Sequence, residues 1–194
     1  VLQFTTGARL SCNDIHDNNK SPGPPTALDQ ATGIDLVTAQ SSVVSENSVH
    51  HNGAAGIQLR VGSTDNVVQA NKIFDNGALL TSTMEGRGIL VTGAGTDDNE
   101  IRSNEILRNH GRGIVLSRPA GTVPITGNLV FKNRLRENWR CGVCIMGAAQ
   151  NNIVLRNDAM GNNFSGLAPC LTFNLFDDAP IDNFWLKNQG ASNF

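Results

Sequence analysis

The sequence predicts an all-β solenoid, in which short parallel strands stack coil upon coil along one axis. Three observations lead to this prediction: a pattern that repeats about every 24 residues, an excess of turn-forming residues, and the lack of helical periodicity. The 194 residues include 20 glycines and 23 asparagines, which are poor in helix interiors and typical of turns. No stretch keeps a 3.6-residue apolar period over three turns, so neither a helical bundle nor an α/β enzyme is expected.

The repeat unit reads apolar-x-x-Asn-x-apolar-x-x-Asn-x-x-x-Gly-apolar. From Ile101, for example, Asn104, Ile106, Asn109 and Gly113 follow at offsets of 3, 5, 8 and 12 residues. A degenerate seventh copy is read at Leu171, and the six clear copies start at Leu10, Val44, Val68, Ile101, Ile125 and Val154. Their glycines are Gly33, Gly56, Gly88, Gly113, Gly142 and Gly166.

Each copy is interpreted as one coil of three short strands joined by tight corners. Apolar residues at equivalent positions would stack into buried columns, because no coil can bury its core alone. Asparagine at the corners tolerates left-handed backbone and can bond along the axis, and the glycine is expected to supply a positive φ. We expect one domain, 1–194, with about six to seven coils over about residues 10–176 and a C-terminal cap over about 177–194.

This repeat resembles that of the right-handed parallel β-helix, in the pectate-lyase-like superfamily with its NosD-like and polysaccharide-modifying members. The resemblance covers roughly residues 10 to 176. It implies the fold, and it implies carbohydrate as the substrate class and secretion, at the cell surface or in the periplasm, as the location. The repeated residues belong to the scaffold and do not specify an activity.

Insertions into the repeat point to a binding face. Three are read between the second asparagine and the glycine, at 19–32, 77–87 and 134–141. Insertions at the same position of the repeat project from the same corner of a solenoid. Three loops would therefore border the strand that starts at the glycine and form a groove. The alternative is neutral drift in loop length, which costs little.

The groove strand and its loops supply the candidate site residues. Catalytic candidates are Asp35, Arg60, Glu85 and His110. Arginines suit carboxylate or sulfate recognition, and an aromatic side chain can stack on a sugar ring. The substrate-binding candidates are Gln58, Arg87, Arg112, Arg118, Glu137, Trp139 and Arg140. Each arginine taken singly could be a solvated surface residue, and Trp139 could pack within its own loop.

Other titratable groups are given structural interpretations. His16 and His50 are expected to be half-buried members of one column, with His51 and His110 exposed; such columns could bind a metal only if neighbouring coils bring them together, and no metal site is assigned. Asp97 and Asp98 are expected to form a turn rather than a glycosidase pair.

The cysteines, Cys12, Cys141, Cys144 and Cys170, predict one disulfide or none, without indicating the pairing, and a zinc site is disfavoured.

Two functions lead, with action on a small molecule in the loop-bordered pocket as a third possibility. The first is a polysaccharide lyase or epimerase acting in the groove, where a base removes the C5 proton of a uronate and positive charge, from arginine, lysine or Ca²⁺, neutralises its carboxylate. The second is a non-catalytic module that binds a glycan or a protein. Sites that resemble those of alginate epimerases carry a catalytic tyrosine and an Asp-Pro-His-Asp motif. This chain has neither. No cofactor is identified, and Ca²⁺ is left open.

Charge and hydropathy exclude other classes. The formal charge is −2, so no basic stripe for nucleic acid is expected. No apolar run reaches 18 residues, so no membrane span is expected, and no basic amphipathic helix indicates surface binding. The sequence determines neither the oligomeric state nor whether the natural chain extends upstream of Val1.

Overall fold

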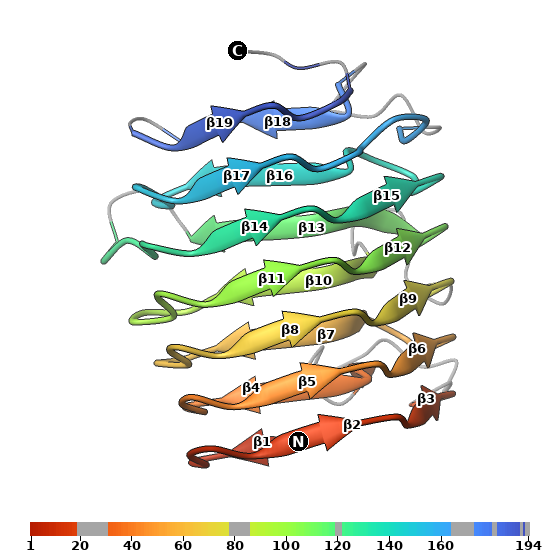
Figure 1. Cartoon of the computed structure of the whole chain (residues 1–194), viewed down its shortest axis with the longest axis vertical. Helices are drawn as coiled ribbons and strands as arrows, with labels where there is room; N and C mark the ends of the chain where they lie inside the picture. Colours follow the sequence, from red (N-terminus) through yellow and green to blue (C-terminus); the bar gives the residue numbers. More distant parts are fainter. Residues whose placement is uncertain are drawn as a thin grey trace.

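The chain folds into a solenoid of parallel strands. The computed structural model describes residues 1–18, 31–77, 86–118, 122–163, 173–179, 182–190 and 192. Successive coils stack along one axis, with the N-terminus at one end of the stack and the C-terminus at the other (Figure 1). The all-β class and the parallel stacking are confirmed, at about seven coils. Within the described residues, no helix is long and apolar enough to span a membrane.

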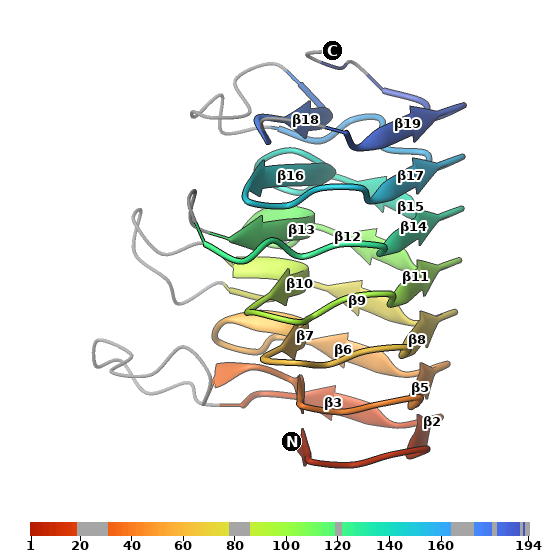
Figure 2. The same cartoon turned by 90° about the vertical axis from the view of Figure 1, so that its left-hand side faces the viewer.

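Three parallel sheets are built along the stack, of which the first two have seven strands each and the third has five, from β3 to β15 (Figure 2). Sheet 1 contains β1 (Leu2–Gln3), β4 (Ile34–Val37), β7 (Ala55–Arg60), β10 (Gly86–Thr92), β13 (Gly111–Arg118), β16 (Val143–Gly147) and β18 (Leu175–Asp177). Sheet 2 contains β2 (Arg9–Ser11), β5 (Val43–Ser45), β8 (Val67–Gln69), β11 (Glu100–Arg102), β14 (Leu129–Phe131), β17 (Ile153–Leu155) and β19 (Phe184–Leu186). Sheet 3 contains β3 (Asp14–His16), β6 (Ser48–His50), β9 (Lys72–Phe74), β12 (Glu105–Leu107) and β15 (Arg134–Arg136).

The core is a set of apolar columns between the sheets. Ile57, Ile89 and Ile114 stand in register on adjacent strands of sheet 1 and are fully buried. Sheets 2 and 3 contribute equivalent columns, such as Val68 with Ile101 and Ile73 with Ile106. Because every column spans several coils, each coil depends on its neighbours for burial, as the repeat predicts.

Asparagine ladders fix the corners. The Nδ2 of Asn104 donates to Oδ1 of Asn133 at 3.0 Å and to the carbonyl of Val68 at 2.9 Å, while its Oδ1 accepts from the amide of Asn71 at 3.0 Å. The repeat predicts two such ladders, at offsets 3 and 8. A third, two residues before each sheet 2 core residue, was missed: Asn66, Asn99, Asn128, Asn152 and Asn183.

The left-handed residue at each corner precedes the asparagine. Ala70, Ser103 and Lys132 have φ values of 54°, 54° and 52°, directly before the ladder asparagines at 71, 104 and 133. The sequence indicates that asparagine tolerates this conformation, but at these corners the residue before the asparagine adopts it. The asparagine is needed because its buried amide satisfies backbone groups of two coils, which would otherwise remain unpaired at a cost.

The repeated glycine serves close approach rather than positive φ. Gly33, Gly56, Gly88, Gly113 and Gly142 are not among the positive-φ residues, and Gly166 lies outside the described residues. A Cβ on Gly33 would lie 2.7 Å from the carbonyl oxygen of Gly56 and 2.7 Å from Cγ1 of Val49. At the start of each sheet 1 strand, the backbone of one coil packs directly against the next coil. The space that a side chain would need is therefore already filled.

Strand register corrects the alignment of the fifth coil. Ile101 pairs with Val130 rather than with Ile125, and Ile106 pairs with Leu135. The coil from Val130 to Gly142 therefore keeps the unit spacing, and residues 134–141 are not an insertion. The extra residues lie earlier, between β13 and β14.

A second shift affects the last copies. Val143 pairs with Leu175, so Asn174 and Leu175 occupy the places predicted for Gly166 and Leu167. Residues 163–173 are thus inserted at the same corner as 19–32 and 77–87. Three insertions do share one corner, but the third is not the one predicted.

The repeat continues into the segment predicted to be a cap. Trp185 of β19 pairs with Val154 of β17, so the final coil starts here and not at Leu171. Its indole packs against the core, and Nε1 donates to Oδ2 of Asp177 at 2.8 Å. This strand ends sheet 2 at the C-terminal end of the stack (Figure 1).

Candidate functional site

The outer face of sheet 1 carries one residue per coil in a straight column. Strand register places them in the order Asp35, Gln58, Leu90, Val115, Cys144 and Phe176. The N-terminal part of this column is polar. The C-terminal part forms a small apolar cluster with the Cys141–Cys144 disulfide, against which Leu90, Met146 and Phe173 pack. Cys12 is an exposed free thiol, and Cys170 lies outside the described residues.

Asp35 and Arg60, two catalytic candidates, bind one another. The Nε of Arg60 donates to Oδ1 of Asp35 at 3.0 Å, and its Nη2 donates to Oδ2 at 2.9 Å. The Asp35 side chain is 3% exposed, so its charge is balanced by this two-point contact. The pair lies on adjacent strands, β4 and β7, and places a fixed polar group in the N-terminal part of the face.

Arg87, Arg112 and Arg140 form a guanidinium cluster beside this column. Arg87 and Arg112 pair in register on β10 and β13, and Arg140 lies in the segment leading to the next strand. Burial first, and then the positive charge of Arg140, lower the pKa of Arg112 to about 10, with Asp178 opposing. Burial and Arg140 also lower the pKa of Arg87.

The cluster concentrates positive charge in partly buried surroundings. Its guanidinium groups are held close enough to repel one another in partly desolvated surroundings, where charge interactions are stronger than in water. The Nε of Arg87 is buried and has no hydrogen-bond partner within the described residues. A carboxylate or sulfate entering here would offset the repulsion and accept charge-assisted hydrogen bonds.

An aromatic pair, His110 and Trp139, lies close in sequence to two members of the cluster, Arg112 and Arg140. The rings of His110 and Trp139 lie 4.6 Å apart between centroids, and Trp139 is 49% exposed. Burial lowers the pKa of His110; Asp75 opposes this and His51 adds to it. The imidazole therefore stays neutral at neutral pH and retains a lone pair that can accept a proton. His110 is half-buried, where exposure was expected.

The remaining candidates are not brought together with the cluster. Gln58 accepts a bond from Thr32 at 3.4 Å, and Arg118 donates to the carbonyl of Val123 at 3.3 Å. Arg118 ends β13 six residues beyond Arg112, about 20 Å away along an extended strand. Glu137 is exposed at a corner with φ 55°. Glu85 lies outside the described residues.

A histidine relay was missed as a unit. The Nε2 of His50 lies 2.9 Å from Oδ1 of Asp14, and its Nδ1 lies 2.7 Å from Nδ1 of His51. His16 and Phe74 stack on either side of His50 at centroid distances of 5.1 and 4.6 Å. His50 is half-buried as expected, whereas His16 is exposed. The consecutive histidines at 50 and 51 were the available signal.

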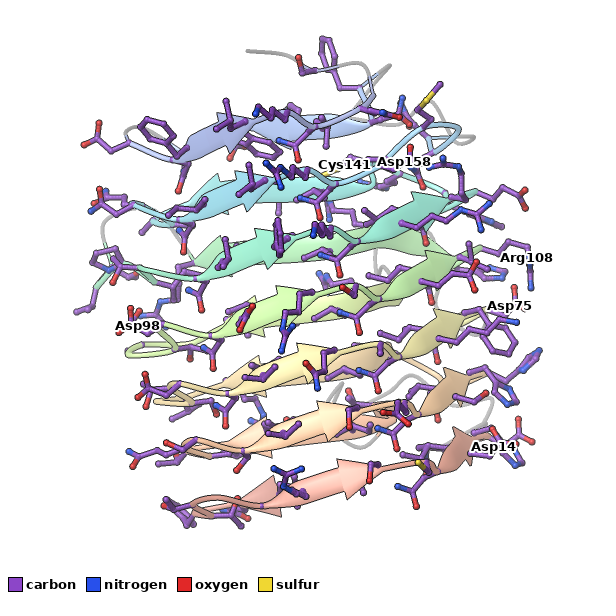
Figure 3. All side chains as sticks on the ribbon, in the orientation of Figure 1. Asp14, Asp75, Asp98, Arg108, Cys141 and Asp158 are labelled. Atoms are coloured by element: carbon purple, nitrogen blue, oxygen red, sulfur yellow. A yellow bond between two sulfur atoms is a disulfide. The ribbon has the colours of Figure 1, made fainter. Side chains whose placement is uncertain are left out.

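Ion pairs and turns account for other candidates. Asp75 and Arg108 pair at 2.9 Å on adjacent coils (Figure 3). Asp97 accepts a bond from the Thr126 amide at 2.7 Å, and Asp98 has φ 55°, consistent with the predicted turn. Over the described part of the chain, no group of three or more histidine, cysteine, aspartate or glutamate residues could hold a metal ion.

Comparison with known proteins identifies the fold. The chain is similar to the periplasmic alginate epimerase AlgG, with a TM-score of 0.67 and 19% identity over 97% of this chain and 40% of that one. It is also similar to the A-module of the mannuronan C-5 epimerase AlgE4 of Azotobacter vinelandii, with a TM-score of 0.58 and 16% identity over 97% of this chain and 56% of that one.

A further similar structure is DFA-IIIase from Arthrobacter chlorophenolicus A6 without its lid, with a TM-score of 0.62 and 12% identity over 97% and 59% of the two chains. The chain thus spans less than half the length of AlgG and under two thirds of the other two. At these identities the likeness establishes the fold alone. A search of curated proteins found no match.

The sequence matches the family described as "Right handed beta helix region" over residues 1–159, which is most of the chain. The turns of the solenoid, its three parallel sheets and the asparagine ladders agree with that match. The protein belongs to the right-handed β-helix family.

Proposed function

We propose that this chain is a carbohydrate-active β-helix protein that binds acidic polysaccharide on the outer face of sheet 1. The observation that carries the proposal is the guanidinium cluster of Arg87, Arg112 and Arg140, whose burial and mutual repulsion favour an anion. The neighbouring Trp139 supports it, because an exposed indole offers a flat surface for a sugar ring.

The finer proposal is lyase or epimerase chemistry on a uronate. The neutral imidazole of His110 would remove the C5 proton, and the electron pair left behind would spread into the carboxylate held by the guanidinium cluster. Loss of the C4 oxygen, which takes up a proton, gives a lyase; return of a proton to the opposite face of C5 gives an epimerase. Asp35, Arg60 and Glu85 remain candidates for substrate binding or proton donation.

The test is turnover on a panel of uronate polymers. Lyase activity appears as the ultraviolet absorbance of the unsaturated product, and epimerase activity as solvent deuterium entering C5. His110→Gln should lose either activity while retaining binding, whereas Arg134→Gln, which alters an exposed arginine paired with Glu105, should leave both unchanged. Because the guanidinium groups supply the positive charge, a chelator of Ca²⁺ should have no effect.

A non-catalytic glycan-binding module is the second candidate. The pairing of Asp35 with Arg60 favours it, since both carboxylate oxygens of Asp35 already accept hydrogen bonds from Arg60. Retention on immobilised uronate polymer without turnover of any substrate would select this function and remove the enzymatic one. Loss of both retention and turnover would remove the acidic glycan as a partner.

An extracytoplasmic location is part of the proposal. The Cys141–Cys144 disulfide is of the kind that persists in oxidising compartments. The similar AlgG structure is described as periplasmic, which agrees with this location. Thiol labelling of the protein taken directly from its native host tests it: labelling of Cys141 and Cys144 before reduction would place the protein in a reducing compartment.

A further inference from the structure

The outer face of sheet 2 changes character along the stack. Near the N-terminal end, its outward residues are largely polar or charged, as with Ser11, Gln69 and the Glu100–Arg102 pair. In the last three strands, β14, β17 and β19, every outward residue is apolar. These six side chains form the apolar patch: Leu129, Phe131, Ile153, Leu155, Phe184 and Leu186.

Strand register makes the six residues one continuous surface. Ile153 stands between Leu129 and Phe184 on adjacent strands, and Leu155 stands between Phe131 and Leu186 in the same way. Phe184 is 68% exposed, Leu186 48% and Ile153 44%. Single exposed apolar residues are ordinary, but a contiguous group on a flat sheet marks an interaction surface.

A column of cations borders the apolar patch. Lys132, Arg156 and Lys187 each follow one of its strands directly, are exposed, and share the left-handed corner conformation with φ between 52° and 54°. The Nζ of Lys132 lies 4.8 Å from the ring centroid of Phe131. On the opposite border the equivalent positions are Gly127, Asn151 and Asp182, and the Asp98 carboxylate lies against Gly127. Three cations therefore stand against two carboxylates around the patch, although the chain as a whole carries −2.

The size of the apolar patch argues against a stable protein interface. Its six partly exposed side chains offer on the order of 400 Å² of accessible surface, against about 800 Å² that each partner buries in a stable complex. A lipid surface sets no such minimum. Apolar side chains that enter the acyl boundary and lysine or arginine near anionic headgroups each add to binding.

We propose that the apolar patch and its cationic border contact an anionic lipid membrane. The sequence contains no basic amphipathic helix, but here strands 24 and 31 residues apart build an equivalent surface. Sheet 1 lies behind sheet 2 when the patch faces the viewer, so the guanidinium cluster would face away from the lipid (Figure 1). The inference is independent of the proposed glycan site.

Sedimentation with vesicles tests this inference. Vesicles of phosphatidylcholine alone are compared with vesicles that also contain phosphatidylglycerol. The wild-type chain should bind the anionic vesicles, and the binding should weaken as salt increases. Ile153→Ser with Phe184→Ser should weaken the partition about tenfold or more, because two exposed apolar side chains lose their transfer from water. Replacing Lys132, Arg156 and Lys187 by glutamine should abolish the preference for phosphatidylglycerol.

Phe4→Ser is the matched control. Phe4 is 74% exposed at the opposite end of the stack, so its replacement should leave vesicle binding unchanged. Melting temperatures establish that all variants fold. Three outcomes would overturn the inference: no binding to either vesicle, equal weakening by Phe4→Ser, or a concentration-dependent dimer, detected by light scattering, that Phe184→Ser dissociates. The last would show that the patch joins copies of this chain.

Discussion

Arg87 and Arg112 occupy directly paired positions on the adjacent strands β10 and β13, so two arginines stand one strand apart in sheet 1. The positive charge of Arg140 lowers the pKa of both. Paired strands normally place opposite or neutral side chains across from one another, since like charges directly opposite are destabilising. Sites that bind ligands often retain such unfavourable arrangements, because the ligand removes the cost.

This arrangement predicts that anions stabilise the protein. Sulfate or a uronate oligosaccharide at a hundredfold excess over its Kd should raise the free energy of unfolding by about 2.7 kcal/mol, and chloride at matched ionic strength should not. Arg87→Gln should remove the effect and leave the ligand-free protein at least as stable as the wild type. Thermal melts of both proteins across an anion series measure this. Equal stabilisation of wild type and variant would place the anion elsewhere.

The pH dependence should follow His110. Burial lowers its folded pKa below the ordinary value of about 6.5, so the unfolded chain binds this proton more readily. Its contribution to stability is therefore complete above about pH 6.5 and is lost as pH falls toward the folded pKa. Urea unfolding of wild type and His110→Gln between these pH values measures the difference. The assignment would be contradicted if the difference in free energy of unfolding between wild type and His110→Gln did not change with pH. It would also be contradicted if that difference widened as the pH fell below the folded pKa.

The glycine that opens sheet 1 should be irreplaceable for reasons of space. A Cβ on Gly88 would lie 2.5 Å from Cγ2 of Ile106 and 2.6 Å from the Gly113 carbonyl, so Gly88→Ala should cost about 2–3 kcal/mol. Gly7 has φ +68°, and no atom lies within 4 Å of the position that a Cβ would take, so Gly7→Ala should cost about 1 kcal/mol from backbone strain alone. Denaturant titrations compare them. A larger loss of stability in Gly7→Ala than in Gly88→Ala would show that backbone conformation, and not space, explains the repeated glycine.

The Asp35–Arg60 pair should behave as a buried unit. Arg60→Met leaves a carboxylate that is 3% exposed without its two-point partner and should cost about 3 kcal/mol, most of which Asp35→Asn in the same chain should restore. The exposed Asp75–Arg108 pair is the control, with an expected cost below about 1 kcal/mol for Arg108→Met. Free energies of unfolding for the single and double variants close the cycle. Strict additivity at Asp35 and Arg60 would contradict the coupling.

The repeat predicted the fold because its signal lies in local spacing. An apolar residue followed by asparagine three and eight residues later specifies one coil, and copies such as those at Val44 and Val68 need only to be aligned. The alignment failed at Ile125, because Asn128 and Val130 follow it by three and five residues. Asn133 and Leu135 follow Val130, the true start of the coil, at the same two offsets. Only strand pairing distinguishes these two registers.

The site was less accessible to sequence because its contacts join separate coils. The sequence placed Arg87, Arg112 and Arg140 in the loops that border the groove strand, but only strand pairing shows that Arg87 and Arg112 lie directly side by side. The contact of Asp35 with Arg60 joins residues 25 apart and links two groups that were interpreted separately. The apolar patch was missed for the same reason, as its members lie on three coils.

Calorimetric titration of matched oligosaccharides tests most directly whether the guanidinium cluster is an acidic-glycan site. A uronate oligosaccharide and its carboxyl-reduced neutral counterpart are titrated into the wild type, Arg87→Gln and Arg134→Gln. We expect the wild type and Arg134→Gln to bind the uronate, and the neutral sugar to bind at least about tenfold more weakly. Arg87→Gln should show a similar loss of uronate affinity, because one charge-assisted contact is removed. Equal binding of the charged and neutral sugars, or full affinity in Arg87→Gln, would contradict it.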